Sequence, residues 1–271
     1  MITRQIEALR DLIAEQDSVA IAFSGGVDST LLASVAQQAL GERALAVTVR
    51  TPYIPRWEIE EAKQLARLRG IRHLIIDLPV PESVINNPAD RCYLCKQVVF
   101  QSIIKAAKEQ GIEAVFDGTN ADDLKDYRPG LRALAELNVR SPLQELGFDK
   151  DTVRAMSREL ALPTWDKPAY ACLLTRIPYD TQLNESDFRM IEQAEVFMIE
   201  LGFRAVRVRK FGDLAKIEVA RETLPRLLDI HVFDKIVYAF KEIGFAQVAL
   251  DMAGYRIGSM NDQLRMGGGN R

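Results

Sequence analysis

Residues 19–35 read VAIAFSGGVDSTLLASV: an apolar run, two adjacent glycines and a second apolar run with helical spacing. The first run is typical of a buried parallel strand and the second of a helix. A strand, a glycine turn and a helix N-terminus present backbone N–H groups to an anion such as phosphate, and a Cβ atom at the turn would block its approach. The residues expected to contact a nucleotide here are Ser24, Gly25, Gly26, Asp28, Ser29 and Thr30.

This loop differs from the common nucleotide-binding P-loop. A Walker sequence has four residues between its glycines and ends in Gly-Lys-Ser/Thr, whereas these glycines are adjacent and no lysine follows them. Asp28 places a carboxylate beside the predicted phosphates, which is favourable when Mg²⁺ binds between them. The stretch resembles the PP-loop of the ATP pyrophosphatases, which implies cleavage of ATP between its α and β phosphates and adenylylation of an acceptor oxygen. An ordinary glycine turn before a helix is the alternative.

Composition places the chain among globular proteins. Its 271 residues are 48% hydrophobic and 27% charged, enough for one large domain and a small one. The formal net charge of -3 provides no global basic field, so we expect no nucleic-acid partner. No apolar run approaches the length of a membrane span, so we expect no membrane partner. Three cysteines, two of them in a Cys-x-x-Cys, fit a reducing cytoplasm better than a disulfide framework.

Strands and helices alternate through the larger, N-terminal part of the chain. Strands are expected at 19–23, 44–49, 73–78 and 113–117, and helices at 4–16, 55–69 and 95–110. The alternation predicts an α/β fold with a doubly wound parallel sheet, of the PP-loop, adenine nucleotide alpha hydrolase-like type. Ligands of such sheets bind beyond the carboxyl ends of the strands.

From residue 184 the pattern changes to a helix, a hairpin, a second helical stretch broken near Asp229, and a strand. The expected ranges are 186–201, 205–220, 222–243 and 246–250. This pattern predicts a second, smaller α+β domain. The predicted domains are a PP-loop ATP pyrophosphatase domain at 1–180 and the α+β domain, for substrate binding and oligomerisation, at 181–271.

A second polar loop, GTNADD at residues 118–123, follows the fourth expected strand. It is either an Asx-rich turn that caps the next helix or a ligand site on the same sheet edge as the glycine loop. In the second case Asp122 helps Asp28 to hold Mg²⁺, and Arg128, in the YRPG stretch that follows, neutralises a phosphate. The nucleotide-binding candidates of this region are Gly118, Asn120, Asp123 and Arg128.

The cysteines are Cys92, Cys95 and Cys172. A structural zinc site requires four ligands, and neither of the two histidines has ligand spacing. A thioredoxin-like pair, inert buried thiols or a persulfide relay are possible readings. A further reading is a [4Fe–4S] cluster held by three thiolates, because three ligands leave one iron open for an exchangeable sulfide.

Nearly the whole chain resembles the LarE family, ATP-dependent sulfur transferases of nickel-pincer nucleotide biosynthesis. The resemblance rests on SGGVDST at 24–30, GTNADD at 118–123, YRPG at 127–130, WDKPAYACLLTRIPY at 165–179, VRVRKF at 206–211 and GYRIGSMN at 254–261. It implies that ATP adenylylates a carboxylate of a pyridinium dicarboxylate mononucleotide. Pyrophosphate leaves, and sulfur then replaces AMP to give a thiocarboxylate.

The resemblance also implies roles for the cysteines. In the simplest members the residue matching Cys172 gives up its own sulfur and becomes dehydroalanine. The presence of Cys92 and Cys95 resembles the three-cysteine branch, in which a [4Fe–4S] cluster carries the sulfide. The residues expected to carry catalysis are therefore these three cysteines, as cluster ligands, and Asp28. The resemblance further suggests a homo-oligomer, and the source of the sulfide is unknown.

A mononucleotide substrate requires a grip for its phosphate. Arg207 and Arg209 share one strand face at a period of two, and Arg256 lies in a glycine-flanked loop. The candidates for bidentate phosphate binding are Arg176, Arg207, Arg209 and Arg256. Glu192, Glu195 and Glu218 could hold a metal nearby, but carboxylates on helices and strands are more often surface charges, which is the expectation here.

Two other functions fit the PP-loop. A tRNA thiolase also combines this loop with a Cys-x-x-Cys and a distant third cysteine, but the acidic balance of charge opposes RNA binding. An amide-forming ligase on the same loop would need no cysteines.

Overall fold

The computed structural model describes residues 2–125, 129–168 and 170–256. The chain divides into two compact units. Unit 1 comprises Met1–Val84 and Asp90–Ala169, and unit 2 comprises Ile85–Ala89 and Tyr170–Arg271. Among the described residues, no helix has both the length and the apolar character needed to cross a membrane.

Unit 1 is built on a parallel sheet with the strand order β3-β2-β1-β4. Its strands are β1 (Val19–Ala22), β2 (Ala44–Arg50), β3 (Arg72–Asp77) and β4 (Ala114–Phe116). Val19, Ala20 and Ile21 of β1 are buried, so both faces of the strand are covered, which explains the apolar run without alternation. The chain runs from β1 outward to β3 and returns to β4 on the other side of β1. The order therefore reverses at β1, and the glycine loop follows that strand at the switch point, where such sheets bind ligands.

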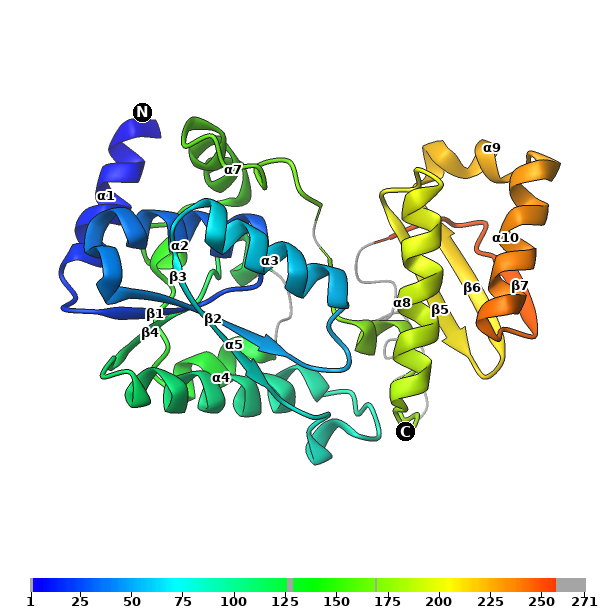
Figure 1. The fold of residues 1–271 in the computed structure, drawn as a ribbon, viewed down its shortest axis with the longest axis horizontal. Coiled ribbons are helices and arrows are strands. Elements are labelled where there is room, and N and C mark those ends of the chain that lie inside the picture. The colour runs from blue at the N-terminus through cyan, green and yellow to red at the C-terminus, as the bar shows by residue number, and fades with distance from the viewer. Residues whose placement is uncertain (1, 126–128, 169, 257–271) are drawn as a thin grey trace. The chain divides into compact units, whose positions relative to one another are not determined.

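Helices cover both faces of this sheet (Figure 1). One layer contains α1 (Ile2–Ala14), α2 (Val27–Leu40), α3 (Arg56–Leu68) and α7 (Lys150–Glu159), and the other contains α4 (Arg91–Glu109) and α5 (Gly130–Glu136). Ile21 and Leu31 belong to the core under the first layer, and Leu45 and Phe100 to the core under the second. The predicted doubly wound α/β fold is confirmed.

Helix α4 begins earlier than the sequence pattern predicted. The expected start was near Cys95, but the helix starts at Arg91 with Asp90 as its N-cap. Aspartate is a favourable N-cap residue, but Asp90 makes no side-chain capping bond to this helix. As a result, Cys92 and Cys95 lie within the first turns of one helix.

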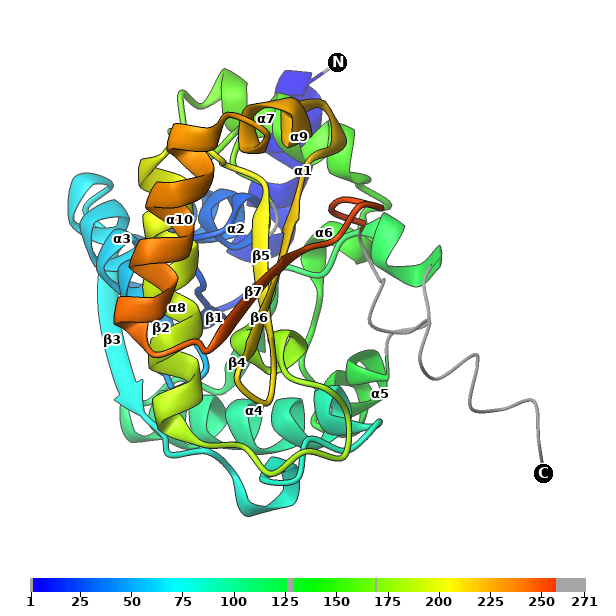
Figure 2. The ribbon, with the colours of Figure 1, turned by 90° about the vertical axis from the view of Figure 1, so that its right-hand side faces the viewer.

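Unit 2 contains a three-stranded sheet in the order β5-β6-β7. The antiparallel hairpin of β5 (Val206–Phe211) and β6 (Leu214–Val219) was expected, and β7 (Gln247–Leu250) runs parallel to β6. Helices α8 (Glu185–Glu200) and α10 (Ile230–Ile243) pack against each other (Figure 2). They bury Met198 and Phe240 against Val208 and Ile217. The helical stretch breaks at Asp229, whose side chain caps α10, as predicted.

Short helical elements complete the chain. They are α6 (Pro142–Glu145), α9 (Leu224–Leu227) and the 3₁₀ turns η1 (Gly41–Arg43), η2 (Glu82–Val84), η3 (Ala121–Lys125), η4 (Leu173–Arg176) and η5 (Arg221–Thr223). Two of them carry predicted site residues: η3 contains the acidic pair of the GTNADD loop, and η4 follows Cys172 directly.

Candidate active site

The glycine loop connects β1 to α2 and is packed tightly against α3. Gly25 has a φ of +70°, and a Cβ atom there would lie 3.2 Å from both Cα and Cβ of Ala62. Only glycine satisfies both the left-handed backbone and the close approach of the helix. Gly26 is the N-cap residue of α2 and uses no side-chain cap, so the first N–H groups of this helix have no partner within it. This local structure is what the sequence predicted for a phosphate-binding loop.

The two serines of the loop are joined to each other. The Ser24 and Ser29 hydroxyls are 3.1 Å apart, and the Ser29 hydroxyl accepts a bond from the Ser24 N–H at 3.2 Å. Gly118, at the end of β4, touches the start of α2, where a Cβ atom would lie 3.1 Å from the Ser29 nitrogen. The glycine loop and the GTNADD loop are therefore in direct contact.

Asp28 is held by one neutral and one cationic donor. The Asn120 amide donates to Oδ1 at 3.0 Å, and Lys150 Nζ contacts Oδ2 at 2.5 Å. Lys150 is the first residue of α7 and lies 122 positions further along the chain. The folded structure thus brings a lysine to a loop whose sequence contains none.

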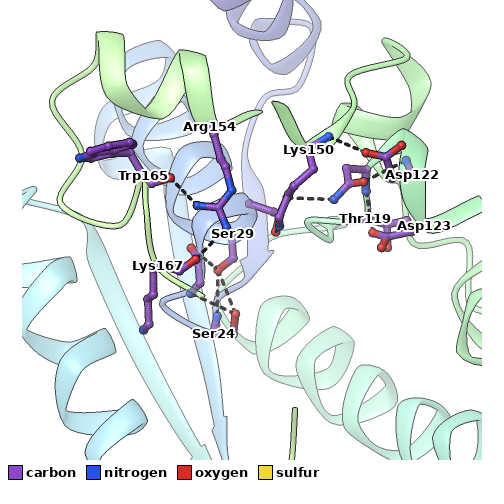
Figure 3. A network of polar contacts seen from close by, with 12 residues as sticks. Ser24, Ser29, Thr119, Asp122, Asp123, Lys150, Arg154, Trp165 and Lys167 are labelled. Carbon is purple, nitrogen blue, oxygen red and sulfur yellow. Dashed lines mark hydrogen bonds and ion pairs between the residues drawn. The ribbon is translucent and has the colours of Figure 1, made fainter. Parts of the chain in front are cut away.

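The GTNADD loop is stabilised by its own side chains. The Asn120 side-chain oxygen accepts from the backbone N–H of Asp122 at 3.0 Å. The Asp123 carboxylate accepts from the backbone N–H of Asn120 at 3.0 Å. The Asp122 carboxylate accepts from the Lys150 N–H at 2.9 Å (Figure 3). The Asx-rich turn is therefore real, and it also places Asn120 against Asp28, so the two interpretations of this loop are compatible.

A second lysine reaches the glycine loop from the segment after α7. Lys167 Nζ donates to the Gly25 carbonyl at 3.0 Å and to the Glu61 carboxylate at 2.6 Å. Arg154 of α7 holds this segment by donating to the carbonyls of Trp165 at 2.6 Å and Lys167 at 2.9 Å (Figure 3). Two cationic side chains, Lys150 at the start of α7 and Lys167 in the segment after it, therefore reach the predicted phosphate loop.

Cys92 and Cys95 are free thiols in unit 1 with different environments. Cys92 is exposed, whereas Cys95 is partly buried and lies 3.1 Å from the Tyr53 hydroxyl. Burial, opposed by the hydrogen bond with Tyr53, raises the pKa of the Cys95 thiol above its ordinary value. Cys172 belongs to unit 2, where it is the N-cap residue of η4.

Three of the four predicted phosphate-binding arginines are buried in unit 2. Arg176 forms a two-point ion pair with Glu195, at 2.7 and 3.2 Å, and Arg209 pairs with Glu218 at 2.5 Å. The expectation that these carboxylates are surface charges is wrong, because only 7% of Glu195 and 1% of Glu218 is exposed. Although burial disfavours the charged form, Glu195 raises the pKa of Arg176 above its ordinary value.

Arg207 has no carboxylate partner of this kind among the described residues. Its guanidinium donates to the Tyr255 hydroxyl at 3.1 Å, weakly to the Arg256 carbonyl at 3.5 Å, and stacks 4.5 Å from the Tyr255 ring centre. Burial, followed by the charges of Arg176 and Arg209, lowers the pKa of Arg207. A buried cation that forms no ion pair is a favourable place for a phosphate.

Two predicted groups are not tested by the described residues. Arg128 lies outside them, so its predicted contact with a phosphate stays a prediction. No group of three or more His, Cys, Asp or Glu side chains in the described ranges is arranged to hold a metal ion. Within the described ranges, neither the predicted Mg²⁺ ligands, Asp28 and Asp122, nor the three cysteines belong to a preformed metal site.

Comparison of the sequence with known proteins identifies the family of this chain. The family model described as NAD synthase matches residues 1–102, the part that carries the glycine loop. The pyridinium-3,5-bisthiocarboxylic acid mononucleotide synthase of Lactiplantibacillus plantarum is 36% identical over 96% of this chain and 93% of that protein. The chain belongs to the family of that synthase, the LarE family.

Other relatives of this LarE-family chain match it over most of their length. Uncharacterized protein slr1717 of Synechocystis is 39% identical over 97% of this chain and 99% of its own. Uncharacterized protein MJ0830 of Methanocaldococcus jannaschii is 33% identical over 88% of this chain and 90% of its own. Membership confirms the predicted family resemblance and the prediction of an ATP-dependent enzyme.

Sequence reasoning missed Lys150, Lys167, Arg154 and Tyr53. Lysines and arginines are abundant on protein surfaces, so their sequence positions alone gave no signal. A partial signal existed for Lys167, because it lies in the WDKPAYACLLTRIPY stretch, one of the segments that carry the family resemblance. Long irregular segments of this kind frequently belong to active sites.

Proposed function

We propose that this chain is an ATP-dependent sulfur transferase that converts a carboxylate of a pyridinium dicarboxylate mononucleotide into a thiocarboxylate, for nickel-pincer nucleotide synthesis. The observation that carries the proposal is the glycine loop with Asp28, Lys150 and Lys167 around it, in a chain matched over 96% of its length by the L. plantarum synthase. That match favours the small-molecule substrate over the tRNA of a thiolase.

The first step is activation of the substrate. A carboxylate oxygen attacks the α-phosphate of ATP, which forms an acyl-adenylate and releases pyrophosphate. The N-terminus of α2 and the two lysines would stabilise the negative charge of the departing pyrophosphate. Mg²⁺, when bound, would neutralise phosphate charge beside Asp28 and Asp122. These residues fit it, because Mg²⁺ commonly takes one or two carboxylates and completes its shell with phosphates and water.

The second step is sulfur transfer. A sulfide sulfur attacks the carbonyl carbon of the acyl-adenylate, and AMP leaves as the thiocarboxylate forms. AMP is a good leaving group and a carboxylate oxygen is a poor one, so activation has to precede sulfur attack. The arginine cluster of unit 2 would hold the phosphate of the mononucleotide, with Arg207 as the buried arginine that forms no ion pair within the described ranges.

The thiols would deliver the sulfur. Cys92 and Cys95 are free and lie in one helix segment, an arrangement that fits two ligands of a [4Fe–4S] cluster, with Cys172 as the third. Such a cluster, when bound, supplies an iron with an open position for an exchangeable sulfide. In the sacrificial alternative Cys172 forms a thioester with the substrate, and β-elimination then leaves the thiocarboxylate and dehydroalanine.

The experiment that tests the function is turnover of purified protein with ATP and the pyridinium dicarboxylate mononucleotide. We expect substrate-dependent pyrophosphate and AMP, and a product whose mass has changed by replacement of one oxygen by sulfur. Pyrophosphate without any sulfur product would contradict the proposal and favour the ligase alternative. Iron and sulfide analysis after anaerobic purification, with the mass of the Cys172 peptide after turnover, separates the cluster from the sacrificial route.

The proposal also includes three features that rest on the family resemblance or on the composition of the chain. They are the homo-oligomer, the assignment of residues 181–271 to substrate binding and oligomerisation, and action in the reducing cytoplasm. The source of the sulfide is not part of the proposal.

A further inference from the structure

A short segment of unit 2, Ile85–Ala89, interrupts unit 1 along the chain. Its backbone is bonded to the stretch that follows η4: the Asn87 carbonyl accepts from the Asp180 N–H at 3.2 Å, and the Ile85 carbonyl accepts from the Leu183 N–H at 2.7 Å. We name residues 85–89 the strap. Because the strap leads directly into α4, Cys92 follows Asn87 by only five residues.

One side chain of the strap, that of Asn87, makes three hydrogen bonds. The Asn87 amide donates to the carbonyls of Leu174 at 3.4 Å, Ile177 at 2.9 Å and Pro178 at 2.8 Å. Its two N–H groups thus serve three carbonyls, and the residue is fully buried. Buried backbone carbonyls need donors, so Asn87 satisfies the end of the turn that Cys172 begins.

The backbone of Asn87 shows that this contact is specifically built. Its φ is +50°, a conformation that non-glycine residues seldom adopt and that asparagine tolerates better than most. Aspartate has nearly the same shape and also tolerates this conformation, but its ionised carboxylate has no N–H to donate. Asparagine is therefore the residue type that combines this φ with an amide donor.

We propose that Asn87 is a positioning residue for sulfur transfer: its amide fixes the turn of residues 172–178 and thereby the direction of the Cys172 thiol. The inference rests on the proposed function only in assigning Cys172 to the sulfur step. Asn87 itself touches neither nucleotide nor substrate in this account. It acts by preventing the turn from shifting, since a misplacement of about 1 Å can cost roughly 100-fold in rate.

The test compares Asn87→Asp with a matched control, Asn86→Asp, because Asn86 is the adjacent residue and is exposed. We expect Asn87→Asp to lower thiocarboxylate formation about 100-fold. Binding of α,β-methylene-ATP, an analogue that cannot lose pyrophosphate, should stay unchanged, and Asn86→Asp should match the wild-type protein in both measurements. If Asn87 only maintained the fold, Asn87→Asp would lower thiocarboxylate formation and analogue binding together.

A second readout does not depend on turnover. The rate at which iodoacetamide alkylates Cys172, followed by peptide mass, should change several-fold in Asn87→Asp relative to Cys92 in the same molecule. If Asn87→Asp does not fold, Asn87→Gly accommodates the positive φ and removes the side chain that carries the amide. The alkylation rate of Cys172 in that variant then tests the inference. If a folded Asn87 variant shows the wild-type rates of Cys172 alkylation and of sulfur transfer, the inference is overturned. Absence of sulfur product from the wild-type protein would instead count against the proposed function.

Discussion

Arg154 offers the sharpest test of how α7 supports the glycine loop. Its guanidinium holds the backbone of Trp165 and Lys167, and Lys167 in turn contacts the Gly25 carbonyl. Replacing Arg154 by glutamine shortens the side chain and removes its charge. The shorter, neutral amide cannot reproduce both of the charge-assisted bonds that the guanidinium makes, so the segment that carries Lys167 loses a fixed point.

The size of the effect follows from these contacts. A hydrogen bond that involves a charged group contributes about 1.5–3 kcal/mol, and the half-buried position of Arg154 favours the lower part of that range for each bond. Losing one to two such bonds costs about 1.5–3 kcal/mol, and each 1.4 kcal/mol is roughly tenfold in affinity. If Lys167 contributes to nucleotide binding, the Kd for α,β-methylene-ATP should rise about 10- to 100-fold.

The assay is calorimetric titration of the wild-type protein, Arg154→Gln and Arg158→Gln. Arg158 lies one helical turn further along α7 and is exposed, with its guanidinium 5.3 Å from the Trp165 ring centre. Its replacement removes a cation from the same surface without removing the two backbone contacts. We expect Arg158→Gln to bind the analogue within about twofold of the wild-type protein.

A double-mutant cycle shows whether Arg154 works through Lys167. If it does, adding Lys167→Gln to Arg154→Gln should weaken binding much less than the sum of the two single effects. Full additivity, or equal affinities for Arg154→Gln and Arg158→Gln, would refute the reasoning.

Three further outcomes are expected. Asp28→Asn should lower substrate-dependent pyrophosphate release by about 100-fold or more, since it removes the carboxylate that we propose lies beside the phosphates and Mg²⁺; an unchanged release rate would remove Asp28 from the mechanism. Glu195→Gln leaves the buried charge of Arg176 without its partner and should cost about 3–5 kcal/mol of unfolding free energy, measured by urea denaturation, where an unshifted midpoint would contradict it. Burial, and then Lys63, lower the pKa of His73 below 6.5, so its neutral form stabilises the fold above pH 6.5 and this contribution is lost as the pH falls through the lowered pKa. The melting temperature of His73→Gln should accordingly fall less than that of the wild-type protein on acidification, and parallel curves would argue against this.

Helix boundaries illustrate where local signals were sufficient and where they were misread. The strands of unit 1, the hairpin of unit 2 and the break at Asp229 follow from apolar spacing, turn residues and caps, all of which act over a few residues. The start of α4 was placed too late because Cys92 and Tyr93 carry no strong helix signal, and Asp90 at the N-cap position makes no side-chain capping bond.

Local sequence patterns were enough to predict the glycine loop, the parallel sheet and the edge at which a nucleotide would bind, because backbone angles and hydrophobic periodicity are local properties. Tertiary structure alone decided which side chains meet there. Lys150 reaches Asp28 from 122 positions away, and Asn87 reaches the carbonyl of Leu174 from 87 positions away. Such pairs depend on how helices and turns pack after the chain has folded, and no pattern of neighbouring residues encodes that distance.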